Sequence, residues 1–188
     1  MTFNHYLLAG LLCLGVAPAA LGCGFHPAME VQLESMYPGS LSVAVALRSA
    51  ADNGLIDAAA LEAPGKGTAL YSDSVHRLQE FRKALAASPA TAELPASFSL
   101  GYVESSLWAR YSQSGGEVRV NVHTDGPAEG EAVVLTGEPV LTEVLAGRLS
   151  VDRALVDGLI LIDGNKSEKA AIRHALIATS MANKISKR

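Results

Sequence analysis

Serine, aspartate and histidine, the groups of a hydrolase nucleophile, stand close together in "YSDSVHRL", as Ser72, Asp73, Ser74 and His76. A nucleophilic serine of an α/β-hydrolase sits on a sharp strand-to-helix turn with a Gly-x-Ser-x-Gly pattern, and this stretch lacks that pattern. Ser72 or Asp73 is instead expected to cap the start of a helix, because its side-chain oxygen can accept a free backbone amide. We therefore expect no enzymatic activity.

Histidines and cysteines do not gather in a metal-binding pattern. The histidines His26, His76, His123 and His174 are widely separated, and Asp125 alone follows His123 closely. A zinc site needs three or four convergent ligands. The chain also has no Cys-x-x-Cys-His for haem and no glycine-rich phosphate loop. The sequence thus predicts neither a metal nor a cofactor.

The N-terminus predicts export. "MTFNHYLLAGLLCLGVAPAALGCGF" contains an uncharged apolar run over residues 6–21, which is shorter than the roughly 20 residues of a membrane span and typical of a signal peptide. Its end, Ala20-Leu21-Gly22-Cys23, resembles a bacterial lipobox. That resemblance implies a signal peptide over residues 1–22 and a lipid, such as palmitate, attached to Cys23. An ordinary secretory signal cleaved near Ala-Leu-Gly is the alternative.

Cysteine usage agrees with a lipid anchor. Cys13 would leave with the signal peptide, so Cys23 would be the one cysteine of the mature chain and no internal disulfide could form. In lipoproteins, a glycine such as Gly24 after the modified cysteine implies sorting to the outer membrane. We expect the anchored protein to face the periplasm. The net charge of −4 gives no reason to expect nucleic-acid binding.

The elements that would position these residues follow from the hydrophobic period. Residues 40–54, with Ala-rich composition and a stop at Asn53-Gly54, predict a helix. After a second helix the period changes to two, which predicts a meander of antiparallel strands and then a fourth strand in "EAVVLTG". The remaining elements are a helix over residues 73–87, short helices over 139–146 and 151–157, an interior strand over 159–162, and a last helix over 165–183 with Asn165 and Glu168 as a capping box.

The later part of the chain resembles the sterol carrier protein 2 (SCP-2-like) domain. The resemblance rests mainly on "VVLTGEPVLTEVLAGRLSVDRALVDGLILIDGN", in which Gly147-Arg148-Leu149 ends one short helix and Gly158 opens the last strand. It implies an α/β (α+β) fold with a five-stranded, mainly antiparallel sheet covered by helices. The expected organisation is a signal peptide (1–22), an N-terminal tether and extra helix (23–69) and the SCP-2-like domain (70–188).

The resemblance implies a binding protein for a lipid or another apolar small molecule, such as a sterol, an acyl chain or an isoprenoid, held at a membrane by its lipid anchor. An alternative is a non-enzymatic scaffold with a solid core that docks a protein partner. The apolar residues expected to line the cavity, or else to fill the core, are Phe98, Leu100, Tyr102, Leu107, Tyr111, Val118, Val120, Val122, Val133, Leu135, Leu145, Leu155, Ile172 and Leu176.

Overall fold

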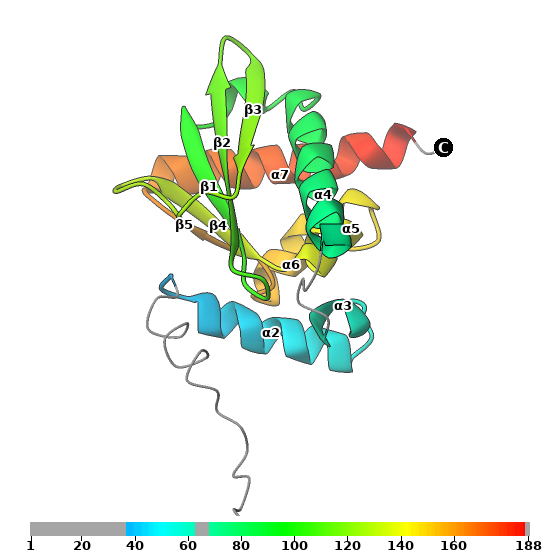
Figure 1. Cartoon of the computed structure of the whole chain (residues 1–188). Helices are drawn as coiled ribbons and strands as arrows, with labels where there is room; N and C mark the ends of the chain where they lie inside the picture. Colours follow the sequence, from blue (N-terminus) through cyan, green and yellow to red (C-terminus); the bar gives the residue numbers. More distant parts are fainter. Residues whose placement is uncertain (1–36, 63–67, 187–188) are drawn as a thin grey trace, which may run out of the picture. The chain divides into compact units, whose positions relative to one another are not determined.

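The computed structural model describes residues 37–62 and 68–186 (Figure 1). The predicted signal peptide, Cys23, most of the tether and most of the loop before the second helix lie outside these residues. The described elements are α2 (Ser40–Asp52), α3 (Ala59–Glu62), α4 (Thr68–Ala86), the 3-10 helix η1 (Thr91–Glu93), β1 (Ser97–Tyr102), β2 (Leu107–Ser114), β3 (Glu117–Val122), β4 (Ala132–Thr136), α5 (Glu138–Leu145), α6 (Val151–Val156), β5 (Leu161–Asp163) and α7 (Lys166–Ser186). Among them, no helix combines the length and the apolar character that a membrane span requires.

The five strands form one sheet in the order β3-β2-β1-β4-β5. The pairs β3–β2, β2–β1 and β4–β5 are antiparallel, whereas β1 and β4 run parallel. The predicted meander and the mainly antiparallel sheet are therefore confirmed. The parallel pair arises because β4 returns to the opposite edge of β1 after β2 and β3 have paired on the first edge.

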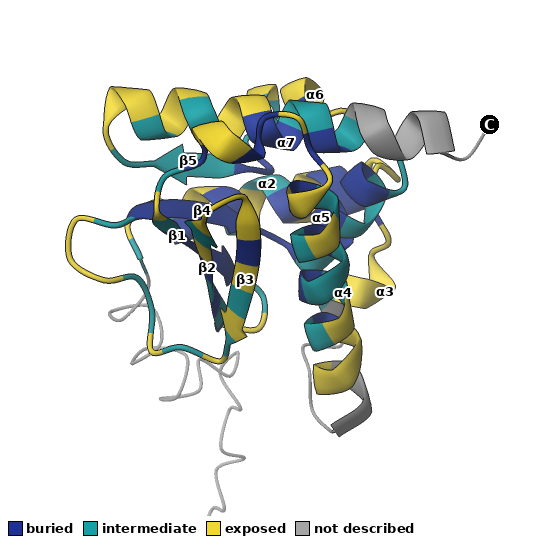
Figure 2. Cartoon of the chain, turned by 90° about the horizontal axis from the view of Figure 1, so that it is seen from above, coloured by how far each residue is buried: buried dark blue, intermediate teal, exposed yellow. Residues whose placement is uncertain are grey.

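Helices lie on both faces of the sheet. On one face α4 packs over β2 and β3, where the ring of Phe81 meets the ring of Tyr111 edge-on at 5.3 Å. On the other face, the chain entering α2 is fixed by Tyr37, whose ring contacts Trp108 and whose hydroxyl donates to Asp163 at 2.8 Å. In Figure 2 the central strands β1 and β4 are mostly buried, and the outer sides of α4 and α7 are exposed. The predicted extra helix is thus part of the same compact unit as the sheet.

The last strand differs from its prediction in position and in environment. β5 begins at Leu161, not at Leu159, and lies at the edge of the sheet, where its residues are half-buried. The amides of Leu159 and Ile160 both donate to the carbonyl of Ala154, at 2.8 and 3.2 Å, which ties them to the end of α6. Pairing with β4 therefore starts two residues later, and the prediction of an interior strand over 159–162 is wrong.

Helix α4 starts earlier than predicted, at Thr68. Ser72 and Asp73 lie within its first turns, so neither caps its start. The hydroxyl of the next serine, Ser74, donates to the carboxylate of Glu138 at 2.5 Å and thereby joins α4 to α5. This pairing between helices could not be read from the local pattern.

The helix boundaries around the recognised motif are confirmed. Gly147 and Gly158 end α5 and α6 with φ of 75° and 71°, a left-handed conformation that glycine adopts without strain. The Asn165 side chain accepts the amides of Ser167 and Glu168 at 3.0 Å, and the Glu168 carboxylate accepts the amide of Asn165 at 3.0 Å. This reciprocal pair is the predicted capping box at the start of α7.

Candidate ligand-binding site

The strand register places most of the predicted lining residues together on the α4 side of the sheet. Leu100 is paired with Ala109, and Tyr111 lies between Phe98 and Val120, so these side chains share one face. The predicted residues on this face are Phe98, Leu100, Tyr102, Leu107, Tyr111, Val118, Val120 and Val122.

Two predicted lining residues lie elsewhere. The parallel register aligns Leu100 with Val134, so Val133 and Leu135 point to the α2 side of the sheet. A parallel pairing could not be anticipated from the alternation within "EAVVLTG". The structure therefore does not bring Val133 and Leu135 together with the other strand residues.

The predicted helix residues are all at least partly covered. Ile172 and Leu176 of α7 and Leu145 of α5 are buried, and Leu155 of α6 is half-buried. Side chains pack closely between α4 and the strands β1 and β2. The ring of Phe98 stacks on the ring of Tyr111 with 5.1 Å between their centroids, and the Tyr111 hydroxyl donates to the carbonyl of Leu78 at 3.0 Å. These two contacts hold the Tyr111 side chain in place between the sheet and α4.

A groove of about 550 Å³ runs between α4 and α5, and Leu145 is one of its lining residues. Its apolar surface comes from small and aliphatic residues, and its lining also includes three cationic side chains. The lining residues are Arg77, Glu80, Lys83, Ala84, Ala87, Thr142, Leu145, Ala146 and Arg148. The volume lies within the range of about 300–1,000 Å³ that small-molecule sites occupy. The groove is therefore large enough for a small molecule, and its lining offers both apolar and charged groups.

The charges beside this groove are partly neutralised. Arg77 pairs with Glu80 at 2.5 Å, and Arg148 makes a two-pronged contact with Glu143 at 2.6 and 2.7 Å. The bond from Arg148 holds the pKa of Glu143 below its usual value. Lys83 is exposed and leaves positive charge at the side of the groove.

A polar cluster lies at the end of β1, where the chain meets the first turns of α4 and α5. We use "polar cluster" for Ser74, Arg77, Tyr102, Glu104 and Glu138. One carboxylate oxygen of Glu104, Oε1, accepts the backbone amide of Glu138 at 2.6 Å, which is a free amide at the start of α5. The other carboxylate of the cluster, on Glu138, accepts the hydroxyl of Ser74. The cluster thus joins β1, α4 and α5.

Three buried polar atoms of the cluster have no hydrogen-bond partner among the described residues. They are the hydroxyl of Tyr102, Oε2 of Glu104 and Nε of Arg77. Tyr102 is only 1% exposed. An unpartnered buried polar group costs about 1–3 kcal/mol, and most such groups in native proteins find a partner. Three of them at one place mark the polar cluster as a candidate binding site.

Burial also changes the acidity of the cluster. It raises the pKa of Glu104 from 4.5 to about 7, and the nearby charge of Glu138 adds to this, while the amide bonds to Glu104 act in the opposite direction. Burial likewise raises the pKa of Tyr102, to which Glu138 and Glu104 contribute and which Arg77 opposes. No pattern in the sequence predicts this site, because Glu104 stands in an ordinary polar turn between two strands.

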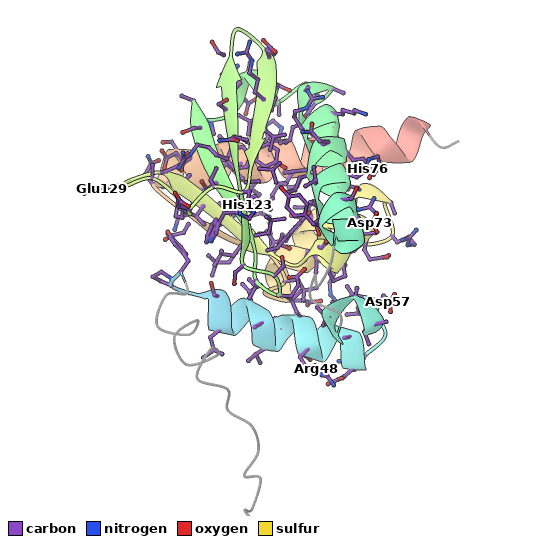
Figure 3. All side chains as sticks on the ribbon, in the orientation of Figure 1. Arg48, Asp57, Asp73, His76, His123 and Glu129 are labelled. Carbon is purple, nitrogen blue, oxygen red and sulfur yellow. The ribbon has the colours of Figure 1, made fainter. Side chains whose placement is uncertain are left out.

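Among the described residues, the histidine and serine side chains considered from the sequence do not gather into one site. Asp73 and His76 are exposed on α4, and His123 follows β3 (Figure 3). The ring of His123 meets the ring of Tyr71 edge-on, with 6.0 Å between the ring centroids. His76 lies 3.4 Å from Glu80, an i,i+4 pair on the helix surface. Within residues 37–62 and 68–186, no group of three or more His, Cys, Asp or Glu side chains is arranged to hold a metal ion.

A second groove, of about 510 Å³, separates α2 from α6. Apolar side chains at this groove are unusually accessible, with Val156 83% exposed, Val45 63% and Leu55 40%. Large apolar side chains gathered on a surface often mark a site of interaction with a partner.

Comparison with known proteins finds similarity to solved structures. No protein-family model matches the chain, and neither does any curated protein sequence. Among solved structures, the chain is similar to a UbiJ-SCP2 ubiquinone synthesis protein (18% identity over 61% of this chain and 96% of that chain, TM-score 0.42). It is similar to sterol carrier protein 2 (22% identity, 60% and 95%, TM-score 0.41). It also resembles the inverting sec-alkylsulfatase Pisa1 from Pseudomonas sp. (17% identity over 52% of this chain, TM-score 0.39), of which it spans 16%.

Proposed function

We propose that this protein binds a lipid or another apolar small molecule, without catalysis, in the groove between α4 and α5. The observation that carries the proposal is a groove of about 550 Å³ whose lining combines aliphatic side chains with the cationic side chains of Arg77, Lys83 and Arg148. Burial of an acyl or isoprenoid chain on Ala84, Ala87 and Leu145 is favourable by roughly 0.8 kcal/mol for each methylene removed from water.

The proposal includes a membrane anchor at Cys23 and a position on the periplasmic side of the outer membrane. Its support is the lipobox-like end of the apolar N-terminal run. A lipid anchor would keep a carrier of apolar molecules next to the bilayer from which those molecules come.

The groove can be tested with two tryptophan variants of one helix. Ala84→Trp places a large ring in the groove, whereas Ala86→Trp adds the same ring at an exposed position of α4 that does not line it. Binding of the apolar fluorophore N-phenyl-1-naphthylamine is expected to weaken about tenfold or more in Ala84→Trp, which corresponds to 1.4 kcal/mol or more. Ala86→Trp is expected to bind like the wild type. Equal binding by both variants would move the site away from α4 and α5.

A scaffold function is the second candidate, favoured by the exposed Val45, Leu55 and Val156 at the α2–α6 groove. Native mass spectrometry of protein purified without detergent separates the two functions. A co-purified lipid or isoprenoid supports the carrier. Ligand-free protein that also fails to bind the fluorophore supports the scaffold.

A further inference from the structure

A pocket of about 430 Å³ lies where the loop after β3 folds back against β2. It shares no residue with the groove between α4 and α5, so the two are separate. Among its lining residues only Pro127 carries an apolar side chain, which suits the pocket to a polar ligand. The lining residues are Arg110, Asn121, His123, Thr124, Asp125, Gly126 and Pro127.

The guanidinium of Arg110 is held in this pocket along one edge. Its Nε donates to both carboxylate oxygens of Glu131 at 3.1 Å, and its Nη2 donates to the carbonyl of Gly126 at 3.1 Å. The Glu131 side chain is only 4% exposed and also accepts the hydroxyl of Ser99 and the amide of Ala128. Arg110 Nη1 makes no hydrogen bond with any described residue. The edge of the guanidinium that carries Nη1 and Nη2 therefore remains available to a ligand, and such an edge matches the two oxygens of a carboxylate.

Asp125 supplies the opposite charge in the same pocket. The amides of the two residues before it donate to the carbonyl of Trp108 at 2.8 and 3.1 Å, and the carbonyl of Gly126 after it accepts from Arg110. Asp125 thus stands in a segment that is bound to β2 on both sides. Its exposed carboxylate makes no hydrogen bond or ion pair with the residues that the structure describes. One anionic group of the pocket is therefore free to meet a cation.

Two further features of the pocket agree with a binding role. His123 has φ of 66°, a left-handed conformation that is uncommon outside glycine and that collects at binding and active sites. Asn121 lies directly opposite Arg110 in the register of β2 and β3, and its side chain is exposed. An amide group both donates and accepts hydrogen bonds, so Asn121 can serve either charged group of a ligand.

We propose that this pocket binds a free amino acid as a zwitterion, with its carboxylate on the free edge of Arg110 and its ammonium on Asp125. The charge pattern carries the proposal. Asp125 repels a ligand with negative charge alone and Arg110 repels one with positive charge alone, whereas a zwitterion pairs with both. The volume also lies within the range of about 300–1,000 Å³ that small-molecule sites occupy.

Three ligands of nearly the same shape test the two charges. L-Alanine carries both, L-lactate has a hydroxyl in place of the ammonium, and L-alaninamide has an amide in place of the carboxylate. Each is titrated into the isotope-labelled full chain at about pH 7, where α-amino groups are mostly protonated, and the backbone amide shifts of residues 121–126 are followed by NMR. L-Alanine is expected to bind about tenfold or more tightly than either analogue, because each analogue leaves one charged side chain unpaired.

Asp125→Asn isolates the contact with the ammonium. The preference for L-alanine over L-lactate is expected to vanish in this variant, because the amide that replaces the carboxylate carries no charge. The matched control is Glu129→Gln, which removes one negative charge from the same loop at a position that does not line the pocket (Figure 3). This control is expected to keep the preference. Since Asp125 makes no bond within the described fold, the melting temperature of Asp125→Asn is expected to equal that of the wild type.

Arg110→Lys isolates the contact with the carboxylate. Lysine keeps a positive charge beside Glu131 but has no planar edge with two nitrogen donors. The preference for L-alanine over L-alaninamide is expected to fall about tenfold. The control is Arg119→Lys, on the same face of the sheet, because the guanidinium of Arg119 is already paired with Glu117 at 2.9 and 3.1 Å. It is expected to leave the preference unchanged.

The outcomes decide this inference independently of the proposed function. Equal binding of the three ligands overturns the zwitterion site, and so does a preference for L-alanine over L-lactate that survives in Asp125→Asn. The absence of any shift at residues 121–126 on addition of L-alanine overturns it as well. None of these results bears on the groove between α4 and α5, which is measured with the fluorophore and lined by other residues.

Discussion

Glu104 illustrates how a single residue acquires an unusual property from its surroundings. One carboxylate oxygen is fixed at the start of α5, and the other is enclosed near Gly137 and Leu47. The amide of Glu138 stabilises the ionised carboxylate, whereas its removal from water destabilises the ionised form. The removal from water has the larger effect, since the pKa of Glu104 rises from 4.5 to about 7.

The raised pKa predicts how stability depends on pH. The folded protein holds a proton on Glu104 up to about pH 7, whereas an unfolded chain loses it near 4.5, so the free energy of unfolding falls as pH rises between these values. The loss is at most about 1.4 kcal/mol per pH unit. Urea unfolding of wild type and Glu104→Gln from pH 4 to pH 8 measures it, and the difference between the two proteins is expected to shift in favour of Glu104→Gln as pH rises. A constant difference would contradict the burial of this carboxyl.

At the scale of elements, the turn from α6 to β5 decides where the last strand begins. Gly158 has φ of 71°, and the following two amides are bound to Ala154. A Cβ at Gly158 would lie 3.7 Å from the Cβ of Ala46, an ordinary contact. The requirement for glycine therefore comes from the backbone conformation and not from crowding.

Gly158→Val is consequently expected to lower the free energy of unfolding by about 1–3 kcal/mol, the usual cost of a strained backbone conformation. Gly54→Val is an informative comparison, because Gly54 has φ of 69° and a Cβ there would meet nothing within 4 Å. Similar losses in urea unfolding would assign the cost to the backbone alone. A Gly158→Val protein within a few tenths of a kcal/mol of wild type would contradict the role of this turn.

At the scale of the whole molecule, the proposed carrier combines a binding domain with an anchor that lies outside the described residues. The compact unit begins at Tyr37, which is fixed against Trp108 and Asp163. The chain between Cys23 and Tyr37 would then connect the lipid to the domain. An anchored domain needs no membrane-spanning helix of its own.

The anchor is testable by mass and by fractionation. The mature protein is expected to weigh more than residues 23–188 by a diacylglycerol-type adduct, and Cys23→Ser is expected to move it from the membrane to the soluble fraction. Cys13→Ser is the matched control, since Cys13 is expected to leave with the signal peptide. An unmodified N-terminus at any other residue, found by intact mass, would contradict the anchor.

Features with a short-range cause were predictable from the sequence. The capping box of Asn165 and Glu168, the glycines that end α5 and α6, and the alternation of the meander all depend on residues within a few positions of one another. Backbone preferences and the periods of 3.6 and 2 act locally, so the sequence alone determined these elements and, with the recognised motif, the fold class.

The tertiary structure alone decided how distant segments meet. The parallel pairing of β1 with β4 turned Val133 and Leu135 to the α2 side, and the edge position of β5 left it half-buried. The same packing buried Glu104 and Tyr102 at the end of β1, where each has a polar atom without a partner among the described residues. Register and burial depend on contacts between residues far apart in the chain, and no local pattern encodes the desolvation of a carboxyl. For this reason the most unusual chemistry of the protein emerges only from the folded chain.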